Sequence, residues 1–164
     1  MLLAVISDSH IAAPNHWFGA VFDRYLARAD CLIHCGDMVG ADLFHFMLAH
    51  PALHAVRGNC DQFTTPHDRP TLHSFALTTP RGHALNIGVA HGWGERASVW
   101  KRVWESFPDH QLICYGHTHR RDWSLHQGAR ILNPGSLAEG SLALVTLADD
   151  GELSCEFVDI SPAH

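Results

Sequence analysis

The stretch LICYGHTH, residues 112–119, joins a strand-like run to two histidines. Leu112–Tyr115 is apolar without alternation, which is typical of a strand buried on both faces. On extended backbone, His117 and His119 would point to the same side, roughly 6.5–7 Å apart at Cα. Two imidazoles at that spacing suit a metal ion. The chain has 15 histidines, so two surface or core imidazoles are an equal alternative on this stretch alone.

Four more apolar runs end in polar side chains that could join the two histidines. They are Leu2–Ile6 before Asp8 and His10, Cys31–Cys35 before Asp37, Ala52–Arg57 before Asn59, and Ala84–Ala90 before His91. Open α/β sheets bind ligands at the carboxyl ends of their strands. Each run alone has a plainer interpretation, such as a capping Asp beside a surface His. Their repetition predicts one site of oxygen and nitrogen donors, enough for two ions.

The periodicity of the chain predicts an α/β (α+β) fold. The expected helices are 15–28, Asp42–Ala49 with Leu43, Phe44, Met47 and Leu48 on its apolar face, and Glu95–Phe107 with Ala97, Trp100, Val103 and Trp104 inward. The expected hairpins are Leu72–Thr79 with Ala84–Ala90, Trp123–His126 with Ala129–Leu132, and Ser141–Leu147 with Glu152–Ile160. A βαβαβ layout followed by a β-rich part predicts two packed mixed sheets flanked by helices.

Length and composition fit one domain, residues 1–164, without linkers or repeats. Hydrophobic residues make up 46% and charged residues 17% of the chain. The net charge is −6, the pI is about 6.2, and the largest basic cluster is the pair Arg120–Arg121. These values argue against a general nucleic-acid groove.

The sequence shows no targeting or membrane segment. Met1–Ile6 lacks the basic lead and cleavage site of a signal peptide, and no apolar run reaches the length of a spanning helix. The 5 cysteines are scattered and odd in number. We therefore expect reduced thiols, a cytoplasmic location and no membrane contact.

The ordered motifs D-x-H, G-D, G-N-C-D, H-G and G-H-T-H resemble those of the calcineurin-like metallophosphoesterase superfamily, and more narrowly its small single-domain phosphodiesterase branch. The resemblance covers essentially the whole chain and implies a four-layer αββα sandwich. It also implies two metal sites that share Asp37. The first would use Asp8, His10, Asp37 and His119, and the second Asp37, Asn59, His91 and His117.

This resemblance implies hydrolysis of a small phosphoester by a hydroxide that bridges two divalent metal ions, without a protein nucleophile. Manganese is the first expectation, and iron, zinc, cobalt or nickel suit the same donors. Asn59 is a further candidate for phosphate contact. Protonation of the imidazoles would compete with the metals, so we expect activity to fall below about pH 6.

Three positions near the motifs have open interpretations. Cys60 replaces the histidine that assists the leaving group in related phosphatases. We expect its side chain to support neighbouring residues, and we expect slow cleavage of alkyl esters because that acid is missing. Arg57 and Arg120 are candidates to bind substrate phosphate, against an alternative of solvated side chains. The loop 62–71 could shape the pocket, and the turn 133–136 matches a family loop near the site.

A second function is compatible with the same resemblance. The retromer subunit that shares this fold works as a protein-interaction scaffold, with a site that lacks full catalytic competence. Retention of all seven donors in this chain favours the enzyme. Exposed tryptophans could form a homo-oligomer contact, although burial in the core is the alternative.

Overall fold

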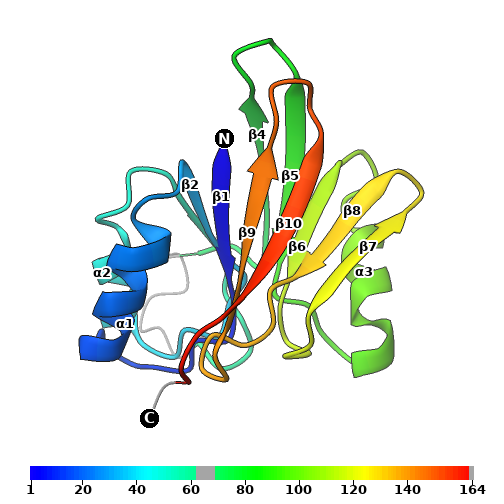
Figure 1. The fold of residues 1–164 in the computed structure, drawn as a ribbon. Helices are drawn as coiled ribbons and strands as arrows, with labels where there is room; N and C mark the ends of the chain where they lie inside the picture. Colours follow the sequence, from blue (N-terminus) through cyan, green and yellow to red (C-terminus); the bar gives the residue numbers. More distant parts are fainter. Residues whose placement is uncertain (62–68, 163–164) are drawn as a thin grey trace.

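The computed structural model describes residues 1–61 and 69–162, and within them ten strands form two five-stranded sheets (Figure 1). The strands of the first sheet are β1 (Leu2–Ile6), β2 (Cys31–His34), β3 (Leu53–Ala55), β9 (Ser141–Leu147) and β10 (Leu153–Asp159). Those of the second are β4 (Leu72–Thr78), β5 (Ala84–Ala90), β6 (Leu112–Tyr115), β7 (Asp122–His126) and β8 (Ala129–Asn133). The strand orders are β10-β9-β1-β2-β3 and β4-β5-β6-β8-β7.

Both sheets are mixed, and their central strands are parallel. In the first sheet β1 pairs with β2 and β2 with β3 in parallel, whereas β9 and β10 are antiparallel. In the second, β5, β6 and β8 are parallel and β4 and β7 are antiparallel edges. All residues of β2 and β6 are buried, as expected for strands that are covered on both faces, and His34 is the polar residue among them.

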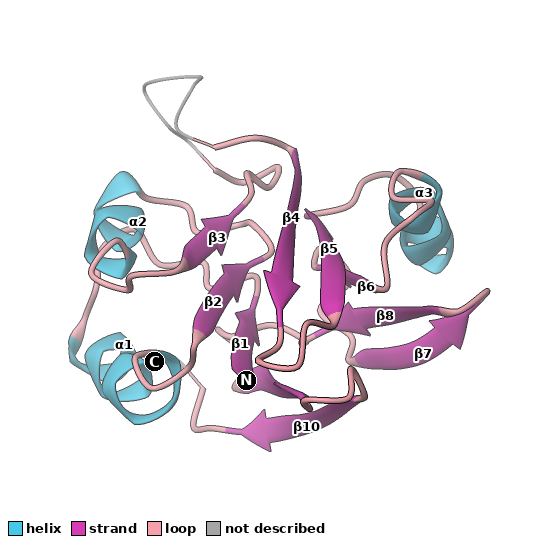
Figure 2. Cartoon of the chain, turned by 90° about the horizontal axis from the view of Figure 1, so that it is seen from above, coloured by secondary structure: helices cyan, strands magenta, loops and turns pink. Residues whose placement is uncertain are grey.

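The helices cover the outer faces of the two sheets (Figures 1 and 2). They are α1 (His16–Val21) with a π-helical turn, Phe22–Leu26, then α2 (Ala41–Met47), and α3 (Val99–Glu105) after a 3₁₀ turn, Arg96–Ser98. Phe18, Leu26 and Leu43 pack with Ile6 of the first sheet. Val99 and Val103 pack with Ile113 of the second. None of the helices in the described part of the chain is long and apolar enough to cross a membrane.

The main core lies between the two sheets. Val5 and Ile33 of the first sheet belong to the same buried cluster as Ile87 and Cys114 of the second. The order from one side to the other is therefore helices, sheet, sheet, helix. This confirms the predicted four-layer architecture. Alternate residues of β5 and β9, such as Leu85 and Ile87 or Ala143 and Val145, belong to the core between the sheets.

The helix predictions were correct in place but wrong in detail. The helix expected at 15–28 starts as predicted, with Asn15 as its N-cap, but continues as the π-helical turn. Leu48 is 55% exposed because α2 ends at Met47. Ala97 is exposed because it lies in the 3₁₀ turn, and Val99 is buried in its place.

Candidate metal centre

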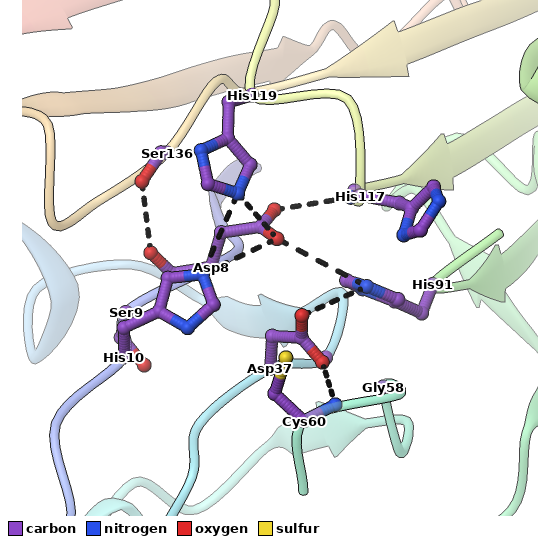
Figure 3. A network of polar contacts seen from close by, with 12 residues as sticks. Asp8, Ser9, His10, Asp37, Gly58, Cys60, His91, His117, His119 and Ser136 are labelled. Atoms are coloured by element: carbon purple, nitrogen blue, oxygen red, sulfur yellow. Dashed lines mark hydrogen bonds and ion pairs between the residues drawn. The ribbon is translucent and has the colours of Figure 1, made fainter. Parts of the chain in front are cut away.

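The loops after β1, β2, β3, β5 and β6 carry all seven predicted donors and meet at one edge of the sandwich. The parallel pairing places the carboxyl ends of these strands together within each sheet. The backbone N–H of His117, from the second sheet, donates to Asp8 Oδ2, from the first, across 3.1 Å. Figure 3 shows Asp8 surrounded by side chains from both sheets. The site is therefore built across the two sheets.

Most of the donor residues have left-handed backbone. The φ angles are +53° at Asp8, +50° at His10, +59° at Asp37, +68° at His117 and +60° at His119. Each such residue costs roughly 1–2 kcal/mol outside glycine, and strain of this kind concentrates at functional sites. The extended backbone expected for the two central histidines is thus wrong. β6 ends at Tyr115, and the turn that follows directs the two imidazoles to neighbouring donor groups.

The first donor group contains Asp8, His10 and His119. His119 Nε2 lies 3.2 Å from Asp8 Oδ1 and 3.4 Å from His10 Nε2. His10 Nε2 lies 3.9 Å from the same carboxylate oxygen. Ligand atoms bound at 2.0–2.2 Å to one ion lie about 3–3.5 Å apart. The two spacings of His119 fit a shared metal, and the spacing between His10 and Asp8 is slightly wider.

The second donor group contains Asp37, Asn59, His91 and His117. His91 Nε2 lies 3.2 Å from Asp37 Oδ2 and 3.1 Å from Asn59 Oδ1. His117 Nδ1 lies 2.9 Å from the same amide oxygen. Asp37 offers a ligand atom within 4.8 Å of those of His10 and Cys60, and also one within 4.8 Å of those of Asp8 and His91. The carboxylate of Asp37 thus lies between the two groups, where a bridging ligand is needed.

Two of the histidines are oriented by an acceptor on their other ring nitrogen. His91 Nδ1 donates to the Cys35 carbonyl oxygen across 2.8 Å, and His119 Nδ1 donates to Glu139 Oε1 across 2.7 Å. Each Nε2 therefore faces the oxygens of the donor groups, where it would supply its lone pair to a bound metal ion. This arrangement is typical of metal-binding histidines.

Asp8 has a buried oxygen that a cation would satisfy. Its side chain is fully buried, and Oδ1 has no hydrogen-bond donor within the described structure. Burial raises the pKa of Asp8, although His91 and His119 oppose the shift. Burial also acts to raise the pKa of Asp37, but hydrogen bonds from His91 and Cys60 outweigh it and hold that pKa well below its usual range. The residues present therefore fit divalent cations.

Two glycines allow the loops to approach this closely. A Cβ on Gly58 would lie 2.1 Å from Asp37 Oδ1, and one on Gly116 would lie 2.0 Å from Ser7 Oγ. Neither contact can be relieved by a flexible chain end, because both partners are short buried side chains. The glycines of the G-N-C-D and G-H-T-H motifs are thus required by space at the site.

Asp61 braces the loop that carries Asp37, a role that sequence reasoning missed. Its carboxylate accepts from the backbone N–H groups of Asp37 (3.1 Å), Met38 (2.6 Å), Val39 (2.8 Å) and Gly58 (2.6 Å). It thereby joins the loops after β2 and β3. The signal was available, because an aspartate at the end of a Gly-Asn run often accepts from nearby backbone donors.

The turn after β8 supports the site from the other side, as expected for residues 133–136. Asn133 Nδ2 donates to the Gly116 carbonyl oxygen and to Thr118 Oγ1, across 2.8 and 3.1 Å. Ser136 Oγ donates to the Asp8 carbonyl oxygen across 3.0 Å (Figure 3). Gly135 has a φ of +81°, which meets the predicted backbone requirement.

Cys60 contacts the donor groups without acting as an activated thiol. Its backbone N–H donates to Asp37 Oδ1 across 2.7 Å, and Asn59 Nδ2 donates to its Sγ across 3.2 Å. Burial and the neighbouring Asp37 raise the pKa of the thiol, which keeps it protonated. The structure therefore favours the supporting role over a nucleophilic one.

The three arginines near the site differ in their surroundings. Arg57 lines a cavity that also includes Asn59 and His91. Arg120 is exposed in the loop after His119. Arg121 is engaged elsewhere, because its guanidinium binds Ser141 Oγ and the carboxylate of Asp159. Of the basic pair, Arg120 alone therefore stays a candidate to bind substrate phosphate. Residues 62–68 of the expected pocket loop lie outside the described residues.

Comparison with known proteins shows which family this chain belongs to. Residues 1–150 match the model of the calcineurin-like phosphoesterase superfamily domain. The chain belongs to the calcineurin-like phosphoesterase superfamily. It is also 30% identical over 160 residues to "Probable metallophosphoesterase YsnB" of Bacillus subtilis, covering 92% of this chain and 86% of that protein.

Solved structures share the phosphoesterase fold of this chain. Wild-type Vps29 of Entamoeba histolytica complexed with Zn²⁺ has a TM-score of 0.66 and 24% identity, over 97% of this chain and 99% of its own. A novel archaeal phosphodiesterase has the same TM-score and 18% identity, over 96% and 100%. At these identities the similarity shows the fold alone.

Proposed function

We propose that this chain hydrolyses phosphodiesters with two divalent metal ions. The observation that carries the proposal is the pair of adjacent donor groups, Asp8–His10–His119 and Asn59–His91–His117, with Asp37 between them. Two bound ions neutralise phosphoryl oxygens and activate water near neutral pH. Manganese is our first candidate, and iron, zinc, cobalt and nickel suit the same ligands.

The protein residues would hold the ions and orient the imidazoles. They would not supply a nucleophile of their own, so water would attack the phosphorus. His91 and His119 are fixed by Cys35 and Glu139, so their Nε2 atoms stay available for metal. The protonated thiol of Cys60 leaves no activated protein nucleophile among the contacts described above. A site without a histidine at this position suits esters whose leaving groups depart as stable anions.

The preference for diesters rests on Cys60 and on the resemblance to the small phosphodiesterase branch. The archaeal phosphodiesterase with this fold is consistent with it. Within the described residues the thiols are free, which suits a reducing compartment such as the cytoplasm. We expect a small phosphoester as substrate, with no general nucleic-acid or membrane binding.

The test is hydrolysis of bis-p-nitrophenyl phosphate and p-nitrophenyl phosphate by protein stripped of metal and then supplied with Mn²⁺. We expect turnover to depend on the added metal, to be faster on the diester, and to be lost in Asp37→Asn and His117→Ala. His45→Ala is the matched control, because this histidine is exposed on α2 away from the site. Equal activity in Asp37→Asn and the control would contradict the proposal.

A protein-interaction scaffold is the second candidate, favoured by the similarity to Vps29. A folded protein that binds two metals but hydrolyses neither ester would support it. The same chain would then be examined for partners, including a second copy of itself.

A further inference from the structure

A cavity of about 490 Å³ adjoins the second donor group. Among the described residues it is lined by Arg57, Gly58, Asn59, Thr71, Leu72, His91, Gly92 and Trp93. Asn59 and His91 thus face both the donor group and the cavity. The side chains of Trp93 and Leu72 are each 44% exposed, large apolar surfaces at the edge of a polar site. The volume lies in the range of small-molecule sites.

Three backbone segments form the walls of the cavity, and hydrogen bonds and strand pairing hold these segments together. The N–H of Arg57 donates to the Pro70 carbonyl oxygen across 2.9 Å. Leu72 pairs with Ala90, directly before His91, in the β4–β5 register. His91 and Asn59 are in contact at 3.1 Å. One of these three contacts, between His91 and Asn59, thus belongs to the donor group itself.

The segment that carries Trp93 is held in place by α3. Arg102 Nε donates to the Trp93 carbonyl oxygen across 2.8 Å, and Arg102 Nη2 donates to the Glu95 carbonyl oxygen across 2.7 Å. Gly92 has a φ of +96°, and a Cβ there would lie 2.4 Å from Val99 Cγ1. Only glycine fits at this turn, which places the indole two residues after a proposed metal ligand.

We propose that this cavity binds a planar aromatic ester group of the substrate, such as the base of a nucleoside, by stacking on Trp93. The inference rests on the proposed function, because the phosphoryl group is placed at Asn59 and His91. Tryptophan offers a flat surface that suits a base of any sequence. Leu72 supplies a second apolar contact, and Arg57 brings a positive charge to the lining of the same cavity.

The substrate class follows from these surroundings. A phosphoester with only a small alkyl group would leave Trp93 and Leu72 in water. A long flexible chain would gain apolar contact but lose the entropy of ordering on binding. A rigid ring system covers the indole without that loss. We therefore assign nucleotide-like diesters as the preferred substrates, with the nucleoside in the cavity.

The test is calorimetric binding to the Mn²⁺-supplied protein, which does not depend on turnover. The ligands are thymidine 5′-monophosphate, cyclohexyl phosphate and methyl phosphate. We expect Trp93→Ala to raise the dissociation constant of the nucleotide about tenfold, within the range for loss of one base-stacking partner. Binding of methyl phosphate should change less than about twofold, and Trp93→Phe should retain most of the nucleotide affinity. Leu125→Ala is the matched control, because Leu125 is an exposed apolar residue on β7.

The outcomes separate this inference from the proposed function. Equal affinity of the wild type for nucleotide and methyl phosphate would overturn the cavity assignment, even if the diester is hydrolysed. An equal loss of affinity for the nucleotide and for methyl phosphate in Trp93→Ala would also overturn the assignment, because the indole would then only support the loop. If cyclohexyl phosphate binds as tightly as the nucleotide, the cavity recognises apolar groups in general, and the proposed aromatic stacking is wrong. Selective nucleotide binding without hydrolysis would retain the cavity and reject the catalytic proposal.

Discussion

His119 Nδ1 donates a hydrogen bond of 2.7 Å to Glu139 Oε1, and this contact turns the opposite nitrogen toward Asp8. Glu139 has a 65% exposed side chain, so it adds little to folding stability. Loss of such an outer carboxylate lowers metal affinity about 10–100-fold. We therefore predict that Glu139→Ala weakens Mn²⁺ binding by this amount, as measured by calorimetry, with little change in melting temperature.

A second glutamate provides the control for this experiment. Glu156 is exposed on β10, and its replacement by alanine should leave metal affinity unchanged. Equal affinities in Glu139→Ala and Glu156→Ala would show that His119 is oriented by other contacts.

Asp61 should be a main determinant of folding stability at the site. Its carboxylate accepts from four backbone N–H groups of two loops. In Asp61→Ala these donors would lack their acceptor, and each buried unsatisfied group costs roughly 1–3 kcal/mol. We predict a loss of at least about 3 kcal/mol in the free energy of unfolding, measured with urea. A loss below about 1 kcal/mol would mean that water replaces the carboxylate without penalty.

Asp8 should stabilise the metal-bound protein and destabilise the metal-free one. Burial raises the pKa of its carboxyl, so the ionised form is disfavoured in the folded state at neutral pH. We predict that Asp8→Asn raises the melting temperature of metal-free protein, because it removes the buried charge. Saturating Mn²⁺ should then stabilise the wild type, by about 2.7 kcal/mol for each site filled at 100 times its dissociation constant, and stabilise the variant less, because only the second donor group remains complete. A variant that melts lower than wild type without metal would contradict this account.

His34 should make the metal-free protein sensitive to acid. Burial, with Arg69 and His91 nearby, lowers the pKa of its imidazole to about 3. The ring accepts from the Gly36 N–H at 3.1 Å and contacts Ser9 Oγ at 3.1 Å, as expected for a neutral core histidine. Between about pH 6.5 and pH 3 the unfolded chain binds a proton that the folded chain does not, so this contribution to stability falls as the pH decreases.

A comparison of wild type with His34→Gln isolates this effect. Asp8 and His91 have raised pKa values and act in the opposite sense, so the wild-type curve alone mixes the contributions. We predict that the free energy of unfolding of wild type falls relative to the variant as the pH is lowered from 7.5 to 5. If the difference in unfolding free energy between wild type and variant did not change with pH, His34 would have the same pKa in the folded and unfolded states, and the account would be wrong.

The sequence predicts the positions of the donors because each follows an apolar run. Parallel strands bring their carboxyl ends to one edge, and this rule alone places Asp8, Asp37 and Asn59 together. It also places His91 and His117 together in the second sheet. A structural role for the glycines of the motifs could also be expected, because loops that pack closely often leave no room for a side chain.

The parts that the sequence did not predict depend on contacts across long chain separations. Glu139 lies 20 residues from His119, and no periodicity relates the two. The left-handed backbone at the donors arises from hydrogen bonds between loops, which local propensity does not describe. Trp93 follows a Gly after β5 and has no pattern of its own, so its place in the cavity needed the structure.

The most direct test of the central claim is a titration of metal-free protein with Mn²⁺ that follows bound metal and diester hydrolysis together. Two adjacent donor groups with Asp37 between them predict that two ions bind per chain and that hydrolysis of bis-p-nitrophenyl phosphate rises with the second. In Asp37→Asn, hydrolysis should be absent at every Mn²⁺ concentration. Full activity with one bound ion, or no hydrolysis with two, would contradict the dinuclear enzyme.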